Sequence, residues 1–329
     1  MSPTPTPSRP DSTSRACIAA VAAEVGKVVV GQEALVDGLL IGLLADGHVL
    51  LEGVPGLAKS LAVQSLAGAL GGTFRRIQFT PDLLPSDLVG TQVYQPSTGA
   101  WSVREGPIFA NFVLADEVNR APAKVQSALL EAMQERQVSL AGETRRLPEP
   151  FLVLATQNPV DQEGTYPLPE AQVDRFMLKV VVTYPSRDAE RDVVMRMAKT
   201  TGRAEVTKVA DPATILAARR EVDALHVDPK LVAYAVDLVR ATRDPSSVGL
   251  SDLAGLVRHG ASPRASIALV MAARARAWLD GKSFVGPADV KSVATAVLSH
   301  RVLMTYEAEA GGVTADAVVA RVTAAVPIP

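Results

Sequence analysis

A loop rich in glycine and proline, residues 53–60, carries the residue types that bind a polyphosphate. It follows a short apolar run, residues 48–51, and it precedes a segment with helical periodicity, residues 61–70. In such an order of strand, loop and helix N-terminus, backbone N–H groups surround phosphate oxygens. Lys59 would reach the β- and γ-phosphates, and the Ser60 hydroxyl would bind Mg²⁺. The residues expected to contact nucleotide here are Gly53, Val54, Pro55, Gly56, Leu57, Ala58, Lys59, Ser60 and Leu61.

This loop departs at one position from the common pattern G-x-x-x-x-G-K-[ST]. Ala58 stands where the last glycine belongs. We expect Ala58 to have a negative φ, because only glycine enters the left-handed region without steric cost. The alternative interpretation is a plain turn followed by a helix that carries a surface lysine.

An acidic pair, Asp116 and Glu117, follows an apolar run at residues 109–115 that is typical of a strand buried on both faces. A carboxylate at the end of such a strand can hold Mg²⁺, and a second one can polarise a water molecule as a general base. We assign the metal role to Asp116 and the base role to Glu117. A solvated acidic pair is the alternative, and the loop upstream makes it the poorer one.

Asn158 and two arginines are further candidates. Asn158 follows the apolar run at residues 151–155 and could bind the γ-phosphate or orient water if its strand lies between the other two. On spacing alone, an Asn-Pro turn explains Asn158 better. Arg175 and Arg264 could stabilise charge on the transferring phosphoryl group, often across a subunit boundary, although each could be a plain surface arginine. Arg120 is a weaker candidate.

The elements that must position these residues change in character along the chain. Strands alternate with helices up to about residue 185, and every later periodic segment indicates a helix. We therefore expect a disordered tail at residues 1–14, an α/β domain at residues 15–185 and a helical domain at residues 186–329. Strands are predicted at residues 48–51, 75–79, 109–115, 151–155 and 176–182, and hairpins at residues 91–103 and 137–147.

Composition narrows the functional class. The 329 residues suggest two domains, and a hydrophobic content of 48% is enough to bury a core. The net charge of −2 and an aromatic content of 4% disfavour a nucleic-acid partner. The single cysteine, Cys17, fits a reducing compartment, so a cytoplasmic protein is expected. Long apolar runs are interrupted by charges, so no membrane span is expected.

Four segments resemble the MoxR family of AAA+ ATPases over nearly all of the chain from about residue 15. They read GVPGLAKS (53–60), LADEVNRAP (114–122), LATQNP (154–159) and LPEAQVDRF (168–176). The segment KVQSALLEAMQE (124–135) makes the match specific to this family. Ala58 fits as well, because loops of this family often read G-x-P-G-x-A-K.

The resemblance implies a fold and a composite ATP site. The fold would be an AAA+ P-loop NTPase core, with a five-stranded parallel sheet between helices and two β-hairpin inserts, followed by an all-α lid domain. The cofactors would be ATP and Mg²⁺, with Ser60 and Asp116 as the metal ligands. The implied roles are Walker A for Lys59 and Ser60, Walker B for Asp116 and Glu117, sensor 1 for Asn158, arginine finger for Arg175, sensor 2 for Arg264, and adenine contact for Gly31 and Gln32.

The resemblance also implies an ATPase that assembles as a homo-oligomer, a hexameric ring, in which Arg175 and Arg264 complete the site of an adjacent subunit. Such proteins act on protein clients in a chaperone-like way, here with a von Willebrand factor A domain partner on a separate chain. A chelatase-type motor subunit that drives metal insertion into a tetrapyrrole is the alternative. A nucleic-acid motor fits the charge and aromatic content less well.

Overall fold

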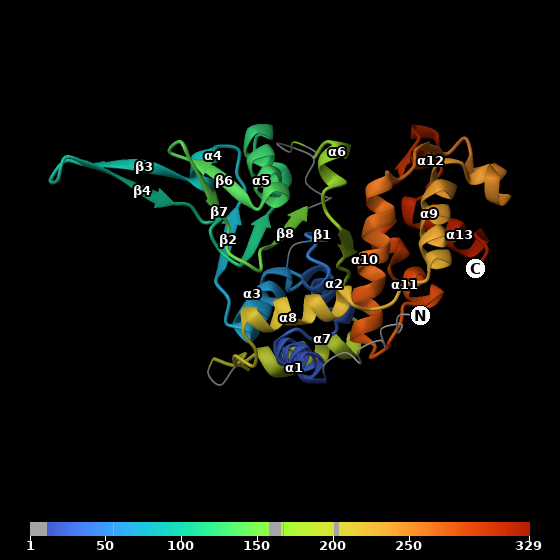
Figure 1. The fold of residues 1–329 in the computed structure, drawn as a ribbon, viewed down its shortest axis with the longest axis horizontal. Helices are drawn as coiled ribbons and strands as arrows, with labels where there is room; N and C mark the ends of the chain where they lie inside the picture. The colour runs from blue at the N-terminus through green and yellow to red at the C-terminus, as the bar shows by residue number, and fades with distance from the viewer. Residues whose placement is uncertain (1–11, 55, 158–165, 167, 201–203) are drawn as a thin grey trace, which may run out of the picture.

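The main element of the fold is a five-stranded, all-parallel sheet with the strand order β2-β5-β8-β1-β9 (Figure 1). The computed structural model describes residues 12–54, 56–157, 166, 168–200 and 204–329. A group of helices lies to one side of the sheet, so the predicted fold class is confirmed. The strands are β1 (Val49–Glu52), β2 (Phe74–Gln78), β5 (Phe112–Asp116), β8 (Leu152–Gln157) and β9 (Leu178–Val181).

Alternate side chains of the central strands pack into two separate clusters on the two faces of the sheet. Leu51 and Leu114 belong to the cluster that includes α1, α2 and α3, whereas Leu50 and Val113 belong to the one that includes α5. Because successive strand residues point to opposite faces, the continuous apolar runs of the sequence cover both. The helices of this part are α1 (Ser12–Val28), α2 (Glu33–Leu44), α3 (Lys59–Leu70), α4 (Pro85–Val89), α5 (Ala123–Glu135) and α6 (Glu170–Val173).

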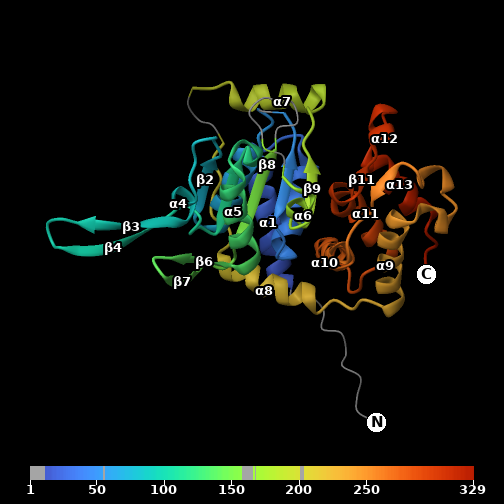
Figure 2. The same ribbon diagram turned by 90° about the horizontal axis from the view of Figure 1, so that it is seen from above.

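Two antiparallel hairpins occupy the positions predicted for them. One pairs β3 with β4 and extends far from the rest of the molecule, and the other pairs β6 with β7 (Figures 1 and 2). The long hairpin exposes Tyr94 and Trp101, whose ring centroids lie 5.2 Å apart. The strands are β3 (Gly90–Gln95), β4 (Ala100–Glu105), β6 (Gln137–Leu140) and β7 (Glu143–Arg146).

Two helices of the helical part, α9 and α10, begin with a polar cap followed by proline. Asp228 accepts a hydrogen bond from the Lys230 N–H, and Ser262 accepts one from the Arg264 N–H. This part also contains a small antiparallel sheet of β10 and β11, which is too short for a periodic signal and was not predicted. The elements are α9 (Pro229–Arg243), β10 (Val257–His259), α10 (Pro263–Leu279), α11 (Pro287–Leu298), β11 (Leu303–Met304), α12 (Tyr306–Ala310) and α13 (Ala315–Ala325).

Two helices that the sequence assigned to the second domain pack on the first. Helix α8 (Pro212–Asp223) contacts α1 and α2 as well as α10, and Arg196 of α7 (Arg187–Met197) donates a hydrogen bond of 3.3 Å to the Lys27 carbonyl. Figure 1 shows both helices beside α1. We therefore propose that the division between the two parts lies near residue 225 in place of the predicted residue 185.

The predicted N-terminal tail is shorter than expected. Helix α1 begins at Ser12, so residues 12–14 are helical and not disordered. Residues 1–11 lie outside the described part of the chain. None of the described helices combines the length and the apolar character needed to cross a membrane.

Candidate functional site

The loop after β1 is shaped by glycine at its start and by a helix N-terminus at its end. A Cβ on Gly53 would lie 2.4 Å from the Val182 carbonyl oxygen next to β9, so only glycine fits there. Helix α3 begins at Lys59, and no side chain caps its first turn. The unpaired N–H groups and the helix dipole therefore make this end of α3 suitable for an anion. Pro55, which was also predicted to contact nucleotide, lies outside the described residues.

The expectation of a negative φ at Ala58 is wrong. Ala58 has φ 59° and ψ 14°, the left-handed conformation, immediately before α3. This conformation costs an alanine about 1–2 kcal/mol. The turn from β1 into α3 therefore overrides the local preference, and alanine is the smallest side chain other than glycine that can occupy it.

A cavity of about 360 Å³ brings the loop and the acidic pair together. Because β8 lies between β1 and β5, the carboxyl ends of all three strands meet at the same edge of the sheet. Gly53 and Val54 are not on the cavity wall, and Val54 packs against the main apolar cluster. The described lining consists of Gly56, Leu57, Ala58, Lys59, Ser60, Leu61, Arg76, Asp116, Glu117 and Thr156.

Lys59 lies half-buried and is the only basic residue of the loop, residues 53–60. Its ammonium group donates a hydrogen bond to the Gly53 carbonyl oxygen. Burial lowers the pKa of Lys59, and the charges of Asp116 and Glu117 oppose that shift. An anionic ligand in the cavity would replace water around this ammonium group with opposite charge.

Thr156 of β8 links the two acidic residues. Its hydroxyl group donates a hydrogen bond of 2.6 Å to Asp116 Oδ1 and accepts one of 2.8 Å from the Glu117 N–H. Thr156 is buried, so this hydroxyl has no competing solvent. The other oxygen of Asp116, Oδ2, accepts hydrogen bonds of 2.6 and 3.0 Å from the half-exposed Arg76.

Glu117 is held in an unusual backbone conformation, with φ 55°. Its Oε2 accepts a hydrogen bond of 3.0 Å from Gln78 and lies 3.1 Å from a guanidinium nitrogen of Arg120. Strained backbone of this kind persists only where neighbouring groups determine it. The Glu117 carboxylate is therefore placed at the cavity wall by two residues from different segments, Gln78 of β2 and Arg120.

Sequence reasoning missed Thr156 and Arg76, and it placed weight on a residue that the structure does not describe. Asn158 lies outside the described residues, although its strand does lie between β1 and β5, as the prediction required. Thr156 stands two residues before Asn158 in the sequence, so the two-residue period of a strand could have drawn attention to it. No signal in the sequence singled out Arg76.

Gly31 and Gln32, the residues expected near adenine, lie away from the loop cavity. Gly31 has φ 69° and borders a second cavity of about 310 Å³, whose lining includes Val30 and Arg196. Gln32 is buried and donates a hydrogen bond of 2.9 Å to the Thr183 carbonyl oxygen. The two cavities have no described lining residue in common.

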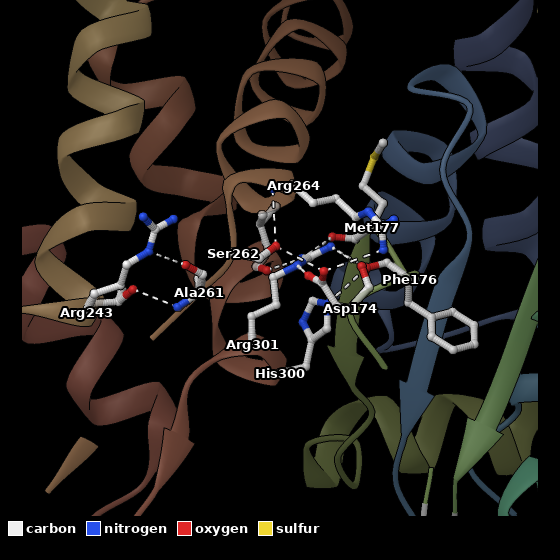
Figure 3. Close-up of polar contacts among 11 residues, drawn as sticks. Asp174, Phe176, Met177, Arg243, Ala261, Ser262, Arg264, His300 and Arg301 are labelled. Atoms are coloured by element: carbon white, nitrogen blue, oxygen red, sulfur yellow. Dashed lines mark hydrogen bonds and ion pairs between the residues drawn. The ribbon is translucent and has the colours of Figure 1, made fainter. Parts of the chain in front are cut away.

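The two candidate arginines lie at the junction of the α/β part with the helices α10 and α11. The nearest guanidinium nitrogen of Arg264 is 3.5 Å from Asp174 Oδ2, beside the chain segment that carries Arg175 (Figure 3). Neither arginine belongs to the described lining of the loop cavity. The single chain therefore does not bring them to the loop.

The residues around the loop cavity fit a nucleotide with a divalent cation. An uncapped helix N-terminus and Lys59 supply positive potential for phosphates. The Ser60 hydroxyl and the Asp116 carboxylate supply the oxygen ligands that Mg²⁺ prefers. The half-exposed side chain of Arg76 pairs with Asp116. A cation at Asp116 would therefore have to displace a side chain that is free to move into solvent.

Comparisons with known proteins agree along the chain. Residues 48–178 match the ATPase family associated with various cellular activities (AAA), and residues 253–322 match the AAA lid domain. "Chaperone MoxR1" of Mycobacterium tuberculosis is 49% identical over 306 residues, which cover 93% of this chain and 81% of that protein. "Protein MoxR" of Paracoccus denitrificans is 36% identical over 298 residues, which cover 86% of this chain and 87% of that one.

One solved structure matches both parts of the fold. The crystal structure of a candidate ATPase from Cytophaga hutchinsonii superposes with a TM-score of 0.91 at 49% sequence identity, and the match covers 96% of each chain. The α/β part and the helical part therefore recur together in related proteins.

Proposed function

Because this chain belongs to the MoxR family of AAA+ ATPases, we propose that it binds ATP with Mg²⁺ and hydrolyses it to remodel or mature partner proteins. One observation carries the proposal. The loop cavity places a helix N-terminus and Lys59 opposite the Asp116–Glu117 pair. Phosphate binding, metal binding and activation of water need these groups in one place.

Each group has a role in this proposal. The loop N–H groups and Lys59 bind the β- and γ-phosphates, and Ser60 with Asp116 holds Mg²⁺. The cation, when bound, neutralises charge on the phosphate oxygens. Glu117 accepts a proton from the attacking water at Oε1, since the described contacts of Gln78 and Arg120 are both at Oε2.

The site of one chain is incomplete in this proposal. Arg175 and Arg264 lie outside the described lining of the loop cavity, which supports a role at the site of an adjacent subunit. We therefore propose a hexameric ring in the cytoplasm, with Asn158 as sensor 1 and Gly31 and Gln32 near the adenine. Protein clients and a von Willebrand factor A domain partner on a separate chain complete the proposal.

Glu117→Gln separates ATP binding from hydrolysis. The variant should bind ATP with the affinity of the wild type, because the loop and Lys59 are unchanged, and it should hydrolyse ATP roughly 10²–10⁴ times more slowly for want of a general base. Glu307→Gln, on the exposed α12, is a matched control that should leave both quantities unchanged. Wild-type turnover in Glu117→Gln would remove Glu117 from the mechanism.

The same variant can identify what the ATPase acts on. Held in ATP, Glu117→Gln should retain a bound client, which affinity purification followed by mass spectrometry would identify against the Lys59→Ala variant as the empty-site control. Recovery of DNA or RNA whose binding weakens steeply with salt would contradict a protein client.

A further inference from the structure

The segment that carries Arg175 is fastened to the helical part of the same chain by several polar contacts. Arg258 of β10 forms an ion pair with Glu170 at the start of this segment. Ser262 donates a hydrogen bond of 3.0 Å to Asp174 Oδ2, directly before Arg175. The Arg175 side chain itself makes no hydrogen bond or ion pair with the described residues. Contacts therefore hold the backbone on either side of Arg175 and leave its guanidinium group available.

Arg301 is the centre of these contacts. Its Nε donates a hydrogen bond of 2.7 Å to Asp174 Oδ1, and its two terminal nitrogens donate to the carbonyl oxygens of Asp174, Phe176 and Met177 at 3.1, 2.6 and 3.0 Å (Figure 3). A further bond goes to the Val297 carbonyl oxygen. Carbonyl groups on both sides of Arg175 are thus bound by one planar group whose donors have fixed directions.

Burial makes this arrangement specific to arginine. The Arg301 side chain is only 2% exposed, and Asp174 is its carboxylate partner. A buried guanidinium group is stable only when its charge is paired and its N–H groups have acceptors. Lysine would keep the charge but could not direct five N–H groups to the same set of oxygens.

His300 strengthens the same attachment. Its Nε2 lies 3.0 Å from the Phe176 carbonyl oxygen, so Nε2 carries the hydrogen that is donated. Burial lowers the pKa of His300 well below its usual value, and its Nδ1 has no hydrogen-bond partner among the described residues. A neutral ring with hydrogen on Nε2 fits both observations.

We propose that Arg301 is a positioning residue that orients Arg175 toward the ATP site of the adjacent subunit. The proposal rests on the proposed role of Arg175 in that neighbouring site. In this proposal the helical part of each chain, and not only the α/β part, sets the geometry of catalysis in the adjacent subunit. Arg264 contacts the same carboxylate at 3.5 Å and is half-exposed, so it can leave Asp174 for a phosphate while Arg301 and Ser262 remain.

A mixing experiment with Arg301→Lys tests this proposal. Alone, the variant should bind ATP as the wild type does, because its own loop cavity is intact. It should hydrolyse ATP roughly 10- to 100-fold more slowly, because Arg175 is displaced from its position. Mixed with Glu117→Gln, which has an intact Arg175 but an inactive site, it should regain activity. Random one-to-one mixing places a competent finger beside an intact site at about a quarter of positions, so up to about a quarter of wild-type turnover should return.

Two controls keep the outcomes distinct. Arg243→Lys alters a guanidinium group that donates to the Ala261 carbonyl, one residue before Ser262. This group has no described hydrogen bond to residues 174–177, so the turnover of the variant should stay near that of the wild type. Arg175→Ala mixed with Glu117→Gln should also regain activity. Failure of that second mixture would overturn the proposed role of Arg175 itself.

With the Arg175→Ala mixture active, a lack of recovery by folded Arg301→Lys would show that Arg301 acts on its own site, and the inference would fail. If Arg301→Lys does not fold, Ser262→Ala decides, since it removes one bond to Asp174, together with the N-cap of α10, without leaving a buried charge. It should show a smaller loss of turnover with the same recovery on mixing. Wild-type turnover in Ser262→Ala, or no recovery, would then overturn the inference.

Discussion

Replacing Thr156 with valine should uncouple ATP hydrolysis from ATP binding. The Thr156 hydroxyl group forms hydrogen bonds with both Asp116 and Glu117. Valine has nearly the same shape, so Thr156→Val removes the hydroxyl without opening a cavity. The Asp116 carboxylate then loses a donor, and the Glu117 N–H loses its acceptor.

The size of the effect follows from the two lost bonds. A hydrogen bond to a charged group contributes about 1.5–3 kcal/mol, and an unsatisfied buried group costs about 1–3 kcal/mol. We therefore expect the free energy of unfolding to fall by about 2.5–6 kcal/mol. If the position of Asp116 carries the charged-bond part of that energy into the transition state, turnover should fall roughly 10- to 100-fold.

ATP affinity, measured by titration calorimetry, should change by less than about threefold, because Lys59 and the loop do not touch Thr156. Thr156→Ser keeps the hydroxyl and should retain most turnover. Thr242→Val is the matched control, since the buried Thr242 also donates one bond, to the Val239 carbonyl, and accepts one, from the Ala261 N–H. Equal loss of turnover in Thr156→Val and Thr242→Val would refute the reasoning.

Three further predictions concern the loop and the core. Lys59→Ala should abolish ATP binding in a titration, and normal affinity would contradict the loop assignment. Ala58→Gly should raise the free energy of unfolding by up to about 1 kcal/mol by relieving the left-handed alanine, and a lower midpoint in chemical denaturation would argue against strain there. Burial lowers the pKa of His48 to about 3, below its unfolded value of 6.5, so the stability due to its neutral form is present above pH 6.5 and is lost toward pH 3. The free energy of unfolding should fall by about 2 kcal/mol between pH 6.5 and 5, and His48→Gln should show a shallower slope in denaturant titrations at the two pH values.

The order of elements in the core could be predicted because strands and helices leave local signals. Runs such as residues 151–155 are apolar at every position, since β8 is covered on both faces. The Asp116–Glu117 pair stood out because two carboxylates directly follow such a run. Helix starts were marked by a cap followed by proline, as at Ser262.

Features that depend on contacts between distant segments could not be predicted. The conformation of Ala58 is set by the path from β1 into α3 and not by its own preference. The position of α8 depends on which apolar faces of α1 and α2 remain to be covered. Arg301 and Asp174 are 127 residues apart, and nothing near either one indicates the other.

The two tryptophans of the chain lie in opposite environments, and one of them is on the protruding hairpin. Trp101 is 66% exposed on β4, whereas Trp278 is fully buried in α10, where its Nε1 donates a hydrogen bond of 3.0 Å to Glu221. Since these are the only tryptophans in the sequence, their fluorescence should separate by quenching, with acrylamide reaching Trp101 alone. The emission of Trp101 is thus a built-in optical reporter of whatever docks on the hairpin, while that of Trp278 records the packing of the helical part.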